Sequence, residues 1–426
     1  AVNDAQPGWT IQVKNGTYGT TGTNNVDSVD INTSCTQANP CTLMAYPGHN
    51  PVIDCTGTDT NHALFHQFAF LFNASRWWIL DGFEVKNCNA AVYLAFNFAT
   101  QQAAGNITVR NMNIHDNTAQ GILSQMADNV YIAWNTIHDI GVCSGSACSS
   151  DIGGSEHAHA IYNAGCNVDN TSCFVTRCMT TNVTMRGNLI YNIPSMGIHN
   201  WSSNNCTQTT GTMLIEDNLV INTYGGIEYS KGYSNGNIAR NNTIILTNPP
   251  QGGVWSTSSG NHAELLSTLY PLSSSSKNLW YNNIFYTNLK NFTNTAGQFF
   301  TVYSAYLAGW ASLSEVTDAN TFDYNIWYVP SELTYLKLLG STGVTITPNM
   351  RTSWQSDLYW DSHDPGTFGT TDPTFMQIST FYDLHIQSSS PARNAGNNGI
   401  CSLVDYDKVT RPQEGVCDIG AYEYVP

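Results

Sequence analysis

Residues 106–116 read Asn-Ile-Thr-Val-Arg-Asn-Met-Asn-Ile-His-Asp, a strand-and-turn phrase that recurs along the chain. The phrase returns as Asn-Val-Tyr-Ile-Ala-Trp-Asn-Thr-Ile-His-Asp at 129–139 and as Asn-Val-Thr-Met-Arg-Gly-Asn-Leu-Ile-Tyr-Asn at 182–192. A looser copy, Met-Leu-Ile-Glu-Asp-Asn-Leu-Val-Ile-Asn, occupies 213–222. A unit that recurs at intervals of roughly 20–50 residues is the signature of a solenoid, in which each coil buries its apolar side against the next. The sequence therefore predicts a stack of similar coils.

An asparagine recurs at one fixed point of the later copies, and alternating apolar residues such as Ile107 and Val109 form the strand part of the phrase. The alternation places one side of a strand inward. Stacked asparagine amides can bond to one another and satisfy the backbone at a tight turn. Because Gly82 and Met112 hold this position in earlier coils, we expect the ladder to begin near the third or fourth coil. The predicted ladder consists of Asn135, Asn188, Asn218, Asn242, Asn283 and Asn325.

The spacing between ladder positions varies, which predicts loops inserted on one side of the solenoid. We expect these insertions at about 140–180, 257–276 and 295–320, within a β-helix that spans residues 1–345. The repeat is lost from about residue 345, so we expect residues 346–426 to form a C-terminal cap packed on the same solenoid. Solenoids collect long loops over one face, and that face usually binds.

The composition excludes some classes of partner. The 426 residues carry a formal net charge of −16, so we expect no nucleic acid and no anionic membrane as partner. No apolar run reaches the length of about 18 residues that a membrane-spanning helix needs. The chain begins at Ala1 without a signal peptide, and we expect that a leader was removed.

The twelve cysteines predict disulfides and therefore a secreted, extracellular protein, with zinc binding as the rival interpretation. Proximity in sequence suggests six pairs: Cys35–Cys41, Cys55–Cys88, Cys143–Cys148, Cys166–Cys173, Cys178–Cys206 and Cys401–Cys417. Asn-x-Ser/Thr sequons would make a eukaryotic secreted form a glycoprotein. Chance explains most of them in a chain this rich in Asn and Thr; they include Asn15, Asn73, Asn106, Asn182, Asn200 and Asn291.

Both ends of the chain resemble a known superfamily. Residues 1–20 contain a Pro-Gly turn, Thr-Ile and Gly-Thr-Tyr, and the last residues carry Ser-Pro-Ala, Asn-Ala-Gly, Arg-Pro and Asp-Ile-Gly-Ala-Tyr-Glu. These motifs are similar to the opening and closing segments of secreted bacterial right-handed parallel β-helix proteins, among them polysaccharide lyases and glycoside hydrolases. The resemblance covers nearly the whole chain and implies an all-β, single-stranded right-handed parallel β-helix with an N-terminal cap. It specifies the fold far better than the activity.

The short Gly-Ile-like segment after each phrase predicts a strip of side chains along one sheet. If Ile122, Ile161, Ile198 and Ile227 point inward, their next neighbours point outward on adjacent rungs. The predicted strip reads Tyr93, Leu123, Tyr162, His199, Glu228 and Trp255, flanked by Trp201.

This strip combines aromatic platforms for sugar rings with titratable groups. We expect Glu228 and His199 to be catalytic, helped by Glu156 and Asp151 from the 140–180 insertion. Two acids support glycoside hydrolysis, whereas a His or Tyr could serve as the base for elimination from a uronate. The alternative is that the strip is a plain surface whose aromatic rings pack under loops. The predicted substrate-binding residues are Tyr93, Tyr162, Trp201, Trp255 and Lys231.

His157 and His159 are alternate residues that would share one face of a strand, and together with Glu156 they are weak candidates for a metal site. Hydrogen bonding is the preferred interpretation, and we expect no cofactor, although calcium is possible in an acidic secreted β-helix. The pairs His115-Asp116 and His138-Asp139 are interpreted as turn caps rather than catalytic dyads.

Two functions of different classes follow. The first is a secreted enzyme that cleaves a polysaccharide, with a hydrolase preferred to a lyase. We expect the polysaccharide to be neutral or weakly acidic, because a chain with 15 Lys and Arg shows no basic stripe for a polyanion. The second is a non-catalytic structural, filament-forming or glycan-binding adhesin-like protein. The chain would be a monomer in the first case, whereas an exposed end coil could build a homopolymer in the second.

Overall fold

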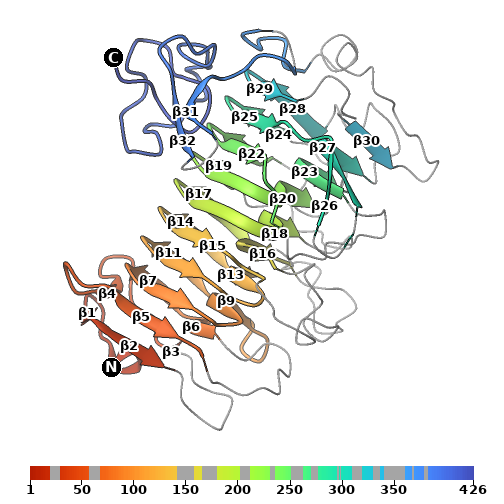
Figure 1. Ribbon diagram of the computed structural model, residues 1–426. Helices are drawn as coiled ribbons and strands as arrows, with labels where there is room; N and C mark the ends of the chain where they lie inside the picture. The colour runs from red at the N-terminus through yellow and green to blue at the C-terminus, as the bar shows by residue number, and fades with distance from the viewer. Residues whose placement is uncertain are drawn as a thin grey trace.

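The computed structural model describes residues 1–19, 29–56, 68–141, 158–165, 180–201, 212–230, 236–250, 262–269, 277–294, 297, 299–308, 319–329, 336–339, 360–366, 369–378 and 382–426. Successive coils stack from the N-terminal to the C-terminal end, and each strand pairs in parallel with its counterpart in the next coil (Figure 1). The predicted fold class, a right-handed parallel β-helix, is confirmed.

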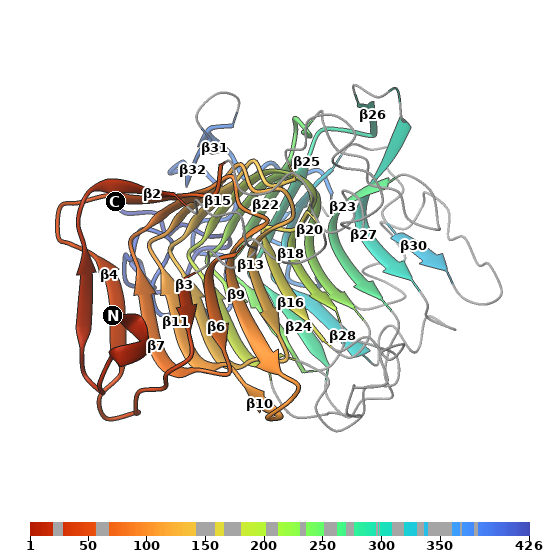
Figure 2. The ribbon, with the colours of Figure 1, turned by 90° about the horizontal axis from the view of Figure 1, so that it is seen from below.

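Each coil contributes strands to three rows, and Figure 2 shows the successive coils one behind another. The first row is a separate ten-stranded sheet in the described part of the chain. Its strands are β1 (Thr10–Val13), β4 (Cys41–Ala45), β7 (Arg76–Asp81), β11 (Gly105–Arg110), β14 (Asp128–Ala133), β17 (Thr181–Arg186), β19 (Met213–Glu216), β21 (Ile238–Arg240), β24 (Asn278–Tyr281) and β28 (Asn320–Asp323).

The second and third rows are joined because the long strands β18 (Leu189–Trp201) and β20 (Leu219–Ser230) run through both. The second row also contains β2 (Gly16–Gly19), β5 (Pro51–Asp54), β8 (Glu84–Lys86), β12 (Asn113–His115), β15 (Thr136–His138), β22 (Thr243–Leu246), β25 (Ile284–Thr287) and β29 (Ile326–Tyr328). The third row also contains β3 (Val29–Ile31), β6 (Phe68–Asn73), β9 (Ala90–Asn97), β13 (Gln120–Gln125), β16 (Ile161–Ala164), β23 (His262–Leu269), β27 (Phe299–Ala308) and β30 (Leu336–Leu339).

A few elements lie outside the rows. They are the 3-10 turn η1 (Val2–Asp4), the antiparallel additions β10 (Gln102–Ala103) and β26 (Asn291–Thr293), and the hairpin of β31 (Phe375–Gln377) and β32 (Asp383–Ile386). No helix in the described ranges is long and apolar enough to cross a membrane.

Left-handed backbone turns the chain between the first and second rows. In each coil from β7 onward, one residue has a positive φ there, and asparagine, aspartate and glycine tolerate this conformation best. The set is Gly82, Asn111, Trp134, Gly187, Asp217, Asn241, Asn282 and Tyr324. Gly187 has a second reason to be glycine, because a Cβ there would lie 2.6 Å from Nε1 of Trp134.

The predicted asparagine ladder is confirmed and occupies the position directly after this turn. The Nδ2 of Asn135 donates to Oδ1 of Asn188 at 2.9 Å, and the backbone N–H of Asn135 donates to the same oxygen at 3.1 Å. The pattern repeats coil by coil through Asn218, Asn242, Asn283 and Asn325. It ends on Asp361, whose Oδ1 accepts from Asn325 at 2.8 Å. The ladder begins at Asn135, as predicted, but this residue lies in the fifth coil, after β14, rather than in the third or fourth.

One assignment in the earlier coils was wrong by a residue. Gly82 is the left-handed turn residue and aligns with Asn111, so the ladder position of that coil is Phe83. Phe83 is buried and packs on Phe70, which lets an apolar ring fill the place that amides occupy later.

The three expected insertions are not loops throughout. The stretch 140–180 contains β16, 257–276 contains β23 and 295–320 contains β27, and all three are third-row strands. Apolar residues such as Ile161 and Leu266 enter the core there, so these segments close coils. The predicted boundary at residue 345 lies outside the described residues.

Three of the predicted disulfides lie in the described ranges and all three are confirmed: Cys35–Cys41, Cys55–Cys88 and Cys401–Cys417. The second joins the ends of β5 and β8 in consecutive coils. The pairs predicted for Cys143, Cys148, Cys166, Cys173, Cys178 and Cys206 lie outside the described residues.

The C-terminal segment packs on the outer side of the second row, where a second apolar core forms (Figure 1). Leu219, Ile221 and Ile245 of the solenoid meet Leu384 and Ile419 of the segment. Outward residues of these coils are therefore apolar, whereas in earlier coils the equivalent positions hold Lys86, His115 and His138.

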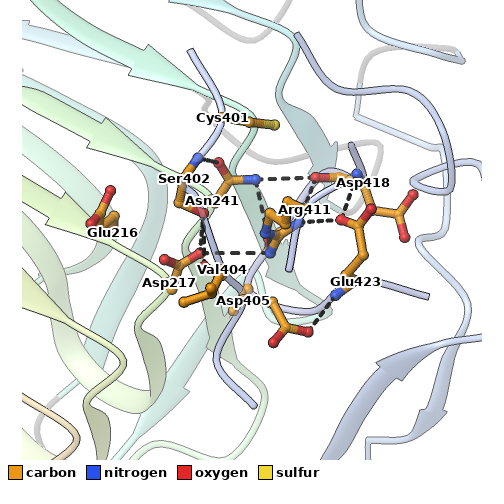
Figure 3. Close-up of polar contacts among 12 residues, drawn as sticks. Glu216, Asp217, Asn241, Cys401, Ser402, Val404, Asp405, Arg411, Asp418 and Glu423 are labelled. Atoms are coloured by element: carbon orange, nitrogen blue, oxygen red, sulfur yellow. Dashed lines mark hydrogen bonds and ion pairs between the residues drawn. The ribbon is translucent and has the colours of Figure 1, made fainter. Parts of the chain in front are cut away.

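A buried ionic network fixes this segment to the turn between the first two rows. Arg411 lies between Asp217 of the solenoid and Glu423 of the segment, and its Nη1 donates to Glu423 at 2.8 Å (Figure 3). Ser402 donates to Asp217 at 2.6 Å. The network holds more carboxyl groups than guanidinium groups: Glu216, Asp217, Asp405, Asp418 and Glu423 against Arg186, Arg240 and Arg411.

Because of this excess of buried carboxyl groups, the stability of the C-terminal cap, residues 382–426 packed on the second row, should depend on pH. Burial is the main cause that raises the pKa of Asp217 to about 7, against a partial offset from Arg411. Burial likewise raises the pKa of Asp418 to about 6.

Replacing Asn218 by Ala tests the ladder. The change leaves the backbone N–H and the side-chain amide of Asn188 without their acceptor. Each buried orphaned group costs about 1–3 kcal/mol, so we expect the free energy of unfolding to fall by that amount or more. Denaturant titration measures it. Asn113→Ala, at an outward position of β12, is the control, and an equal loss in both variants would contradict the ladder's role.

The cap should be more stable in mild acid than at neutral pH. A carboxyl whose pKa is raised on folding binds its proton more tightly in the folded state, so its contribution is complete below the unfolded value of 3.8 and is lost as pH rises through 6 to 7. We expect Asp217→Asn to flatten this dependence in thermal unfolding followed across that window. A wild-type midpoint that rises from acid to neutral pH would contradict the sign. Asp116→Asn, at an exposed turn, is the control.

Candidate functional site

The third row aligns the predicted strip as the sequence indicated. Tyr93 pairs with Leu123, Leu123 with Tyr162, Tyr162 with His199, and His199 with Glu228. The inward neighbours Ile122, Ile161, Ile198 and Ile227 are buried in the core. The register of these five rungs is therefore confirmed.

The sixth rung differs from the prediction. Glu228 pairs with Ser267 of β23, so Ser267 and not Trp255 stands next to it. Gly226 forms the corner in one coil, and Leu265 takes the equivalent place in the next coil. A sequence pattern that requires glycine at the corner therefore misses this rung. Trp255 itself lies outside the described residues, as do Asp151, Glu156, His157 and Lys231.

The strip is covered rather than open. The exposed fraction is 8% for His199, 2% for Glu228 and 0% for Ser267, whereas Tyr93, Tyr162 and Trp201 remain partly exposed. The expectation of an exposed row was wrong for its polar members. A buried carboxylate is tolerated only when it is paired and hydrogen-bonded, and that requirement explains the arrangement that follows.

Five buried side chains form a continuous hydrogen-bonded chain, which we call the Glu228 relay: Ser195, His159, His199, Glu228 and Ser267. Ser195 Oγ lies 3.0 Å from Nδ1 of His159, and Nε2 of His159 lies 2.8 Å from Nδ1 of His199. Nε2 of His199 lies 3.0 Å from Oε1 of Glu228, while Ser267 donates to Oε2 at 3.2 Å.

An aromatic ring lies against this relay. Tyr162 stacks on the His199 imidazole with centroids 4.8 Å apart and planes 7° apart, and it meets His159 edge-on at 4.8 Å. Burial first, and the Glu228 charge second, raise the pKa of Tyr162 well above its ordinary value. The phenol therefore stays protonated and can act as a hydrogen-bond donor near neutral pH.

The flanking residues are less directly connected. Tyr93 donates to Oε1 of Gln125 on the next rung, and burial raises the pKa of Tyr93 to about 12. Trp201 follows His199 on the same outward side of β18 and pairs with Ala164.

Sequence reasoning missed two members of the relay, Ser195 and Ser267. Ser195 reaches it because β18 is irregular between Ile193 and Met196, which no sequence pattern announces. Ser267 was hidden by the glycine search, although the aliphatic Leu266 beside it marks the inward side. His159 is expected from the sequence to lie in the insertion beside the strip and to be hydrogen-bonded rather than metal-bound, but its contact with His199 is not predicted. Its two ring nitrogens are both engaged in the relay, and no group of three metal-ligating side chains occurs in the described ranges.

The His115 and His138 turns fit their interpretation as caps. Each imidazole contacts the following aspartate at 2.7 Å; the two rings stack on each other, and His138 also stacks on Tyr191. They belong to the second row, away from the relay.

Comparison with known proteins supports the assignment of the fold. A family model described as "Pel9A-like, right handed beta helix region" matches residues 1–147. The crystal structure of pectate lyase Pel9A superimposes with a TM-score of 0.56 at 13% identity, covering 100% of this chain and 90% of that chain. At this identity the likeness shows the fold alone, and the chain is a right-handed parallel β-helix protein.

Two further structures superimpose with TM-scores below 0.5, and nothing about this chain is inferred from them. An alginate lyase from Paenibacillus sp. str. FPU-7 has a TM-score of 0.45 at 13% identity, over 81% of this chain and 95% of that chain. The Streptococcus pneumoniae surface protein and adhesin PfbA has a TM-score of 0.39 at 10% identity, over 78% and 88%. No curated protein sequence matches significantly.

Proposed function

We propose that this protein is a secreted carbohydrate-active enzyme that cleaves a neutral or weakly acidic polysaccharide along the third row. Hydrolysis is the preferred reaction, and elimination is the alternative. The observation that carries the proposal is the Glu228–His199 pair, held within a buried relay directly beneath the partly exposed ring of Tyr162. Three disulfides in the described ranges support an extracellular site of action.

Glu228 has the features of an acid–base group. It is almost fully buried, and both of its oxygens are engaged by uncharged or titratable partners rather than by a fixed cation. Such a carboxyl can exchange a proton with a sugar hydroxyl or a water that reaches it beside Tyr162. The aromatic rings of Tyr93, Tyr162 and Trp201 supply faces on which sugar rings stack.

Two observations favour hydrolysis over elimination. Both ring nitrogens of His199 are hydrogen-bonded, so its imidazole has no lone pair free to remove a proton from a uronate ring. In the described part of the chain, His199 is also the one ion-pair partner of Glu228, and no Lys or Arg pairs with that carboxylate. A lyase acting on a polyuronate needs positive charge to stabilise the enolate that forms. Asp151 and Glu156 remain proposed partners, and one of them would supply the second acid of a hydrolase.

The proposal predicts that wild-type protein releases reducing ends from at least one member of a panel of neutral and weakly acidic polysaccharides. We expect Glu228→Gln to lower the rate by about 10²–10⁴-fold, the usual contribution of acid–base catalysis, and His199→Ala to lower it strongly. Reducing-end assays measure hydrolysis, and the ultraviolet absorbance of unsaturated uronates measures elimination.

The matched controls are Glu84→Gln and His138→Ala, which change the same residue types in the second row. Full activity in both Glu228→Gln and His199→Ala would place the site elsewhere. Unsaturated products without net hydrolysis would make the protein a lyase.

A second candidate is a non-catalytic structural or glycan-binding protein, either a monomer or a homopolymer. The burial of Glu228 and Ser267 favours it, because a relay sealed from solvent also serves as a structural network. Long polymers in solution, together with no cleavage of any glycan, would select this candidate.

A further inference from the structure

We propose that His159 is a positioning residue of the cleavage site, oriented in turn by Ser195. It holds His199 in the one protonation pattern that presents a ring N–H to Glu228. This role rests on the proposed function. The hydrogen-bonded chain on which it depends can be tested without any substrate.

The spacing of the two imidazoles fixes how many protons they share. Nε2 of His159 and Nδ1 of His199 are 2.8 Å apart, a distance that admits one hydrogen between them. One ring therefore donates and the other accepts, and the two rings cannot both be imidazolium ions in this geometry.

The other contacts set the direction of donation. The Ser267 hydroxyl donates to Glu228, whose carboxylate accepts at both oxygens, so the proton between His199 and Glu228 belongs to Nε2 of His199. When His199 is neutral, its Nδ1 offers a lone pair, and His159 donates to it from Nε2. The remaining nitrogen of His159, Nδ1, accepts from the Ser195 hydroxyl. Every contact then has one donor and one acceptor.

The elements explain why this pattern is held. His159 precedes β16, Ser195 lies in the irregular part of β18, and His199 lies on the regular part of the same strand. His159 and Ser195 are 0% exposed, and Tyr162 stacks on the second imidazole. A ring flip of His199 would lose the bonds at both nitrogens at once, so the relay keeps its N–H directed at Glu228.

The experiment uses the full chain labelled with nitrogen-15 at histidine. A scalar coupling across the hydrogen bond between Nε2 of His159 and Nδ1 of His199 is expected in the wild type, together with slowly exchanging ring protons. Activity is then compared for His159→Phe, His159→Gln and Ser195→Ala, with His138→Phe as the control in the stacked second-row histidines. Thermal unfolding shows which variants are folded.

We expect His159→Phe to lower kcat by about 10²-fold with little change in KM, because a small misplacement of a reacting group has that effect. His159→Gln keeps an N–H donor and should recover part of the loss, whereas a residue that only fills space would not show this recovery. The coupling needs no variant, so it remains decisive if His159→Phe does not fold.

The outcomes separate the two claims. Absence of the coupling overturns the chain, whatever the activity. If the wild type cleaves glycan and both His159→Phe and His159→Gln are as active as the wild type, the positioning role is overturned and the proposed function stays intact. A wild type that shows the coupling but cleaves no glycan overturns the proposed function, and the positioning role with it.

Discussion

The asparagine ladder between the first and second rows is the interaction on which the rest of the structure depends. Each rung from Asn188 to Asn325 supplies an acceptor for both the backbone and the side chain of the asparagine in the coil before it. Successive coils are thereby locked at one corner with no freedom to slide. A shift of one residue would exchange the inward and outward sides of every strand. The alignment of Tyr162, His199 and Glu228 in the third row is a consequence of that fixed register.

A second constraint is the cost of burying charge, and the molecule meets it in two ways. At the C-terminal cap, Arg411 is surrounded by carboxyl and carbonyl oxygens, so opposite charges satisfy one another. In the third row, Glu228 is satisfied by an imidazole and a hydroxyl, and no Lys or Arg pairs with it in the described chain. The first arrangement anchors the C-terminal segment to the solenoid. The second relies on uncharged or titratable partners, and this contrast distinguishes the relay from the ionic networks elsewhere in the described chain.

Much of the fold could be predicted because it repeats. The ladder residues, the inward isoleucines and five rungs of the strip follow from period and spacing alone. Errors arose where one coil departs from the next. The repeat spacing assigns Gly82 to the ladder position, although this glycine serves the left-handed turn one residue earlier. Ser267 does not follow from the glycine pattern, because Leu265 replaces glycine at the corner. The relay could not be predicted as a whole. Ser195 depends on a local irregularity of β18, and the burial of Glu228 depends on tertiary packing rather than on its neighbours in sequence.

The central claim is that register brings His199 and Glu228 into direct contact, and a double-mutant cycle on stability tests it most directly. The free energy of unfolding is measured for the wild type, His199→Ala, Glu228→Gln and the double variant. Residues in one hydrogen-bonded network should show a coupling energy of about 0.5–3 kcal/mol, and we expect a value within that range. Additive effects within a few tenths of a kcal/mol would show that the two side chains are not in contact and would contradict the account.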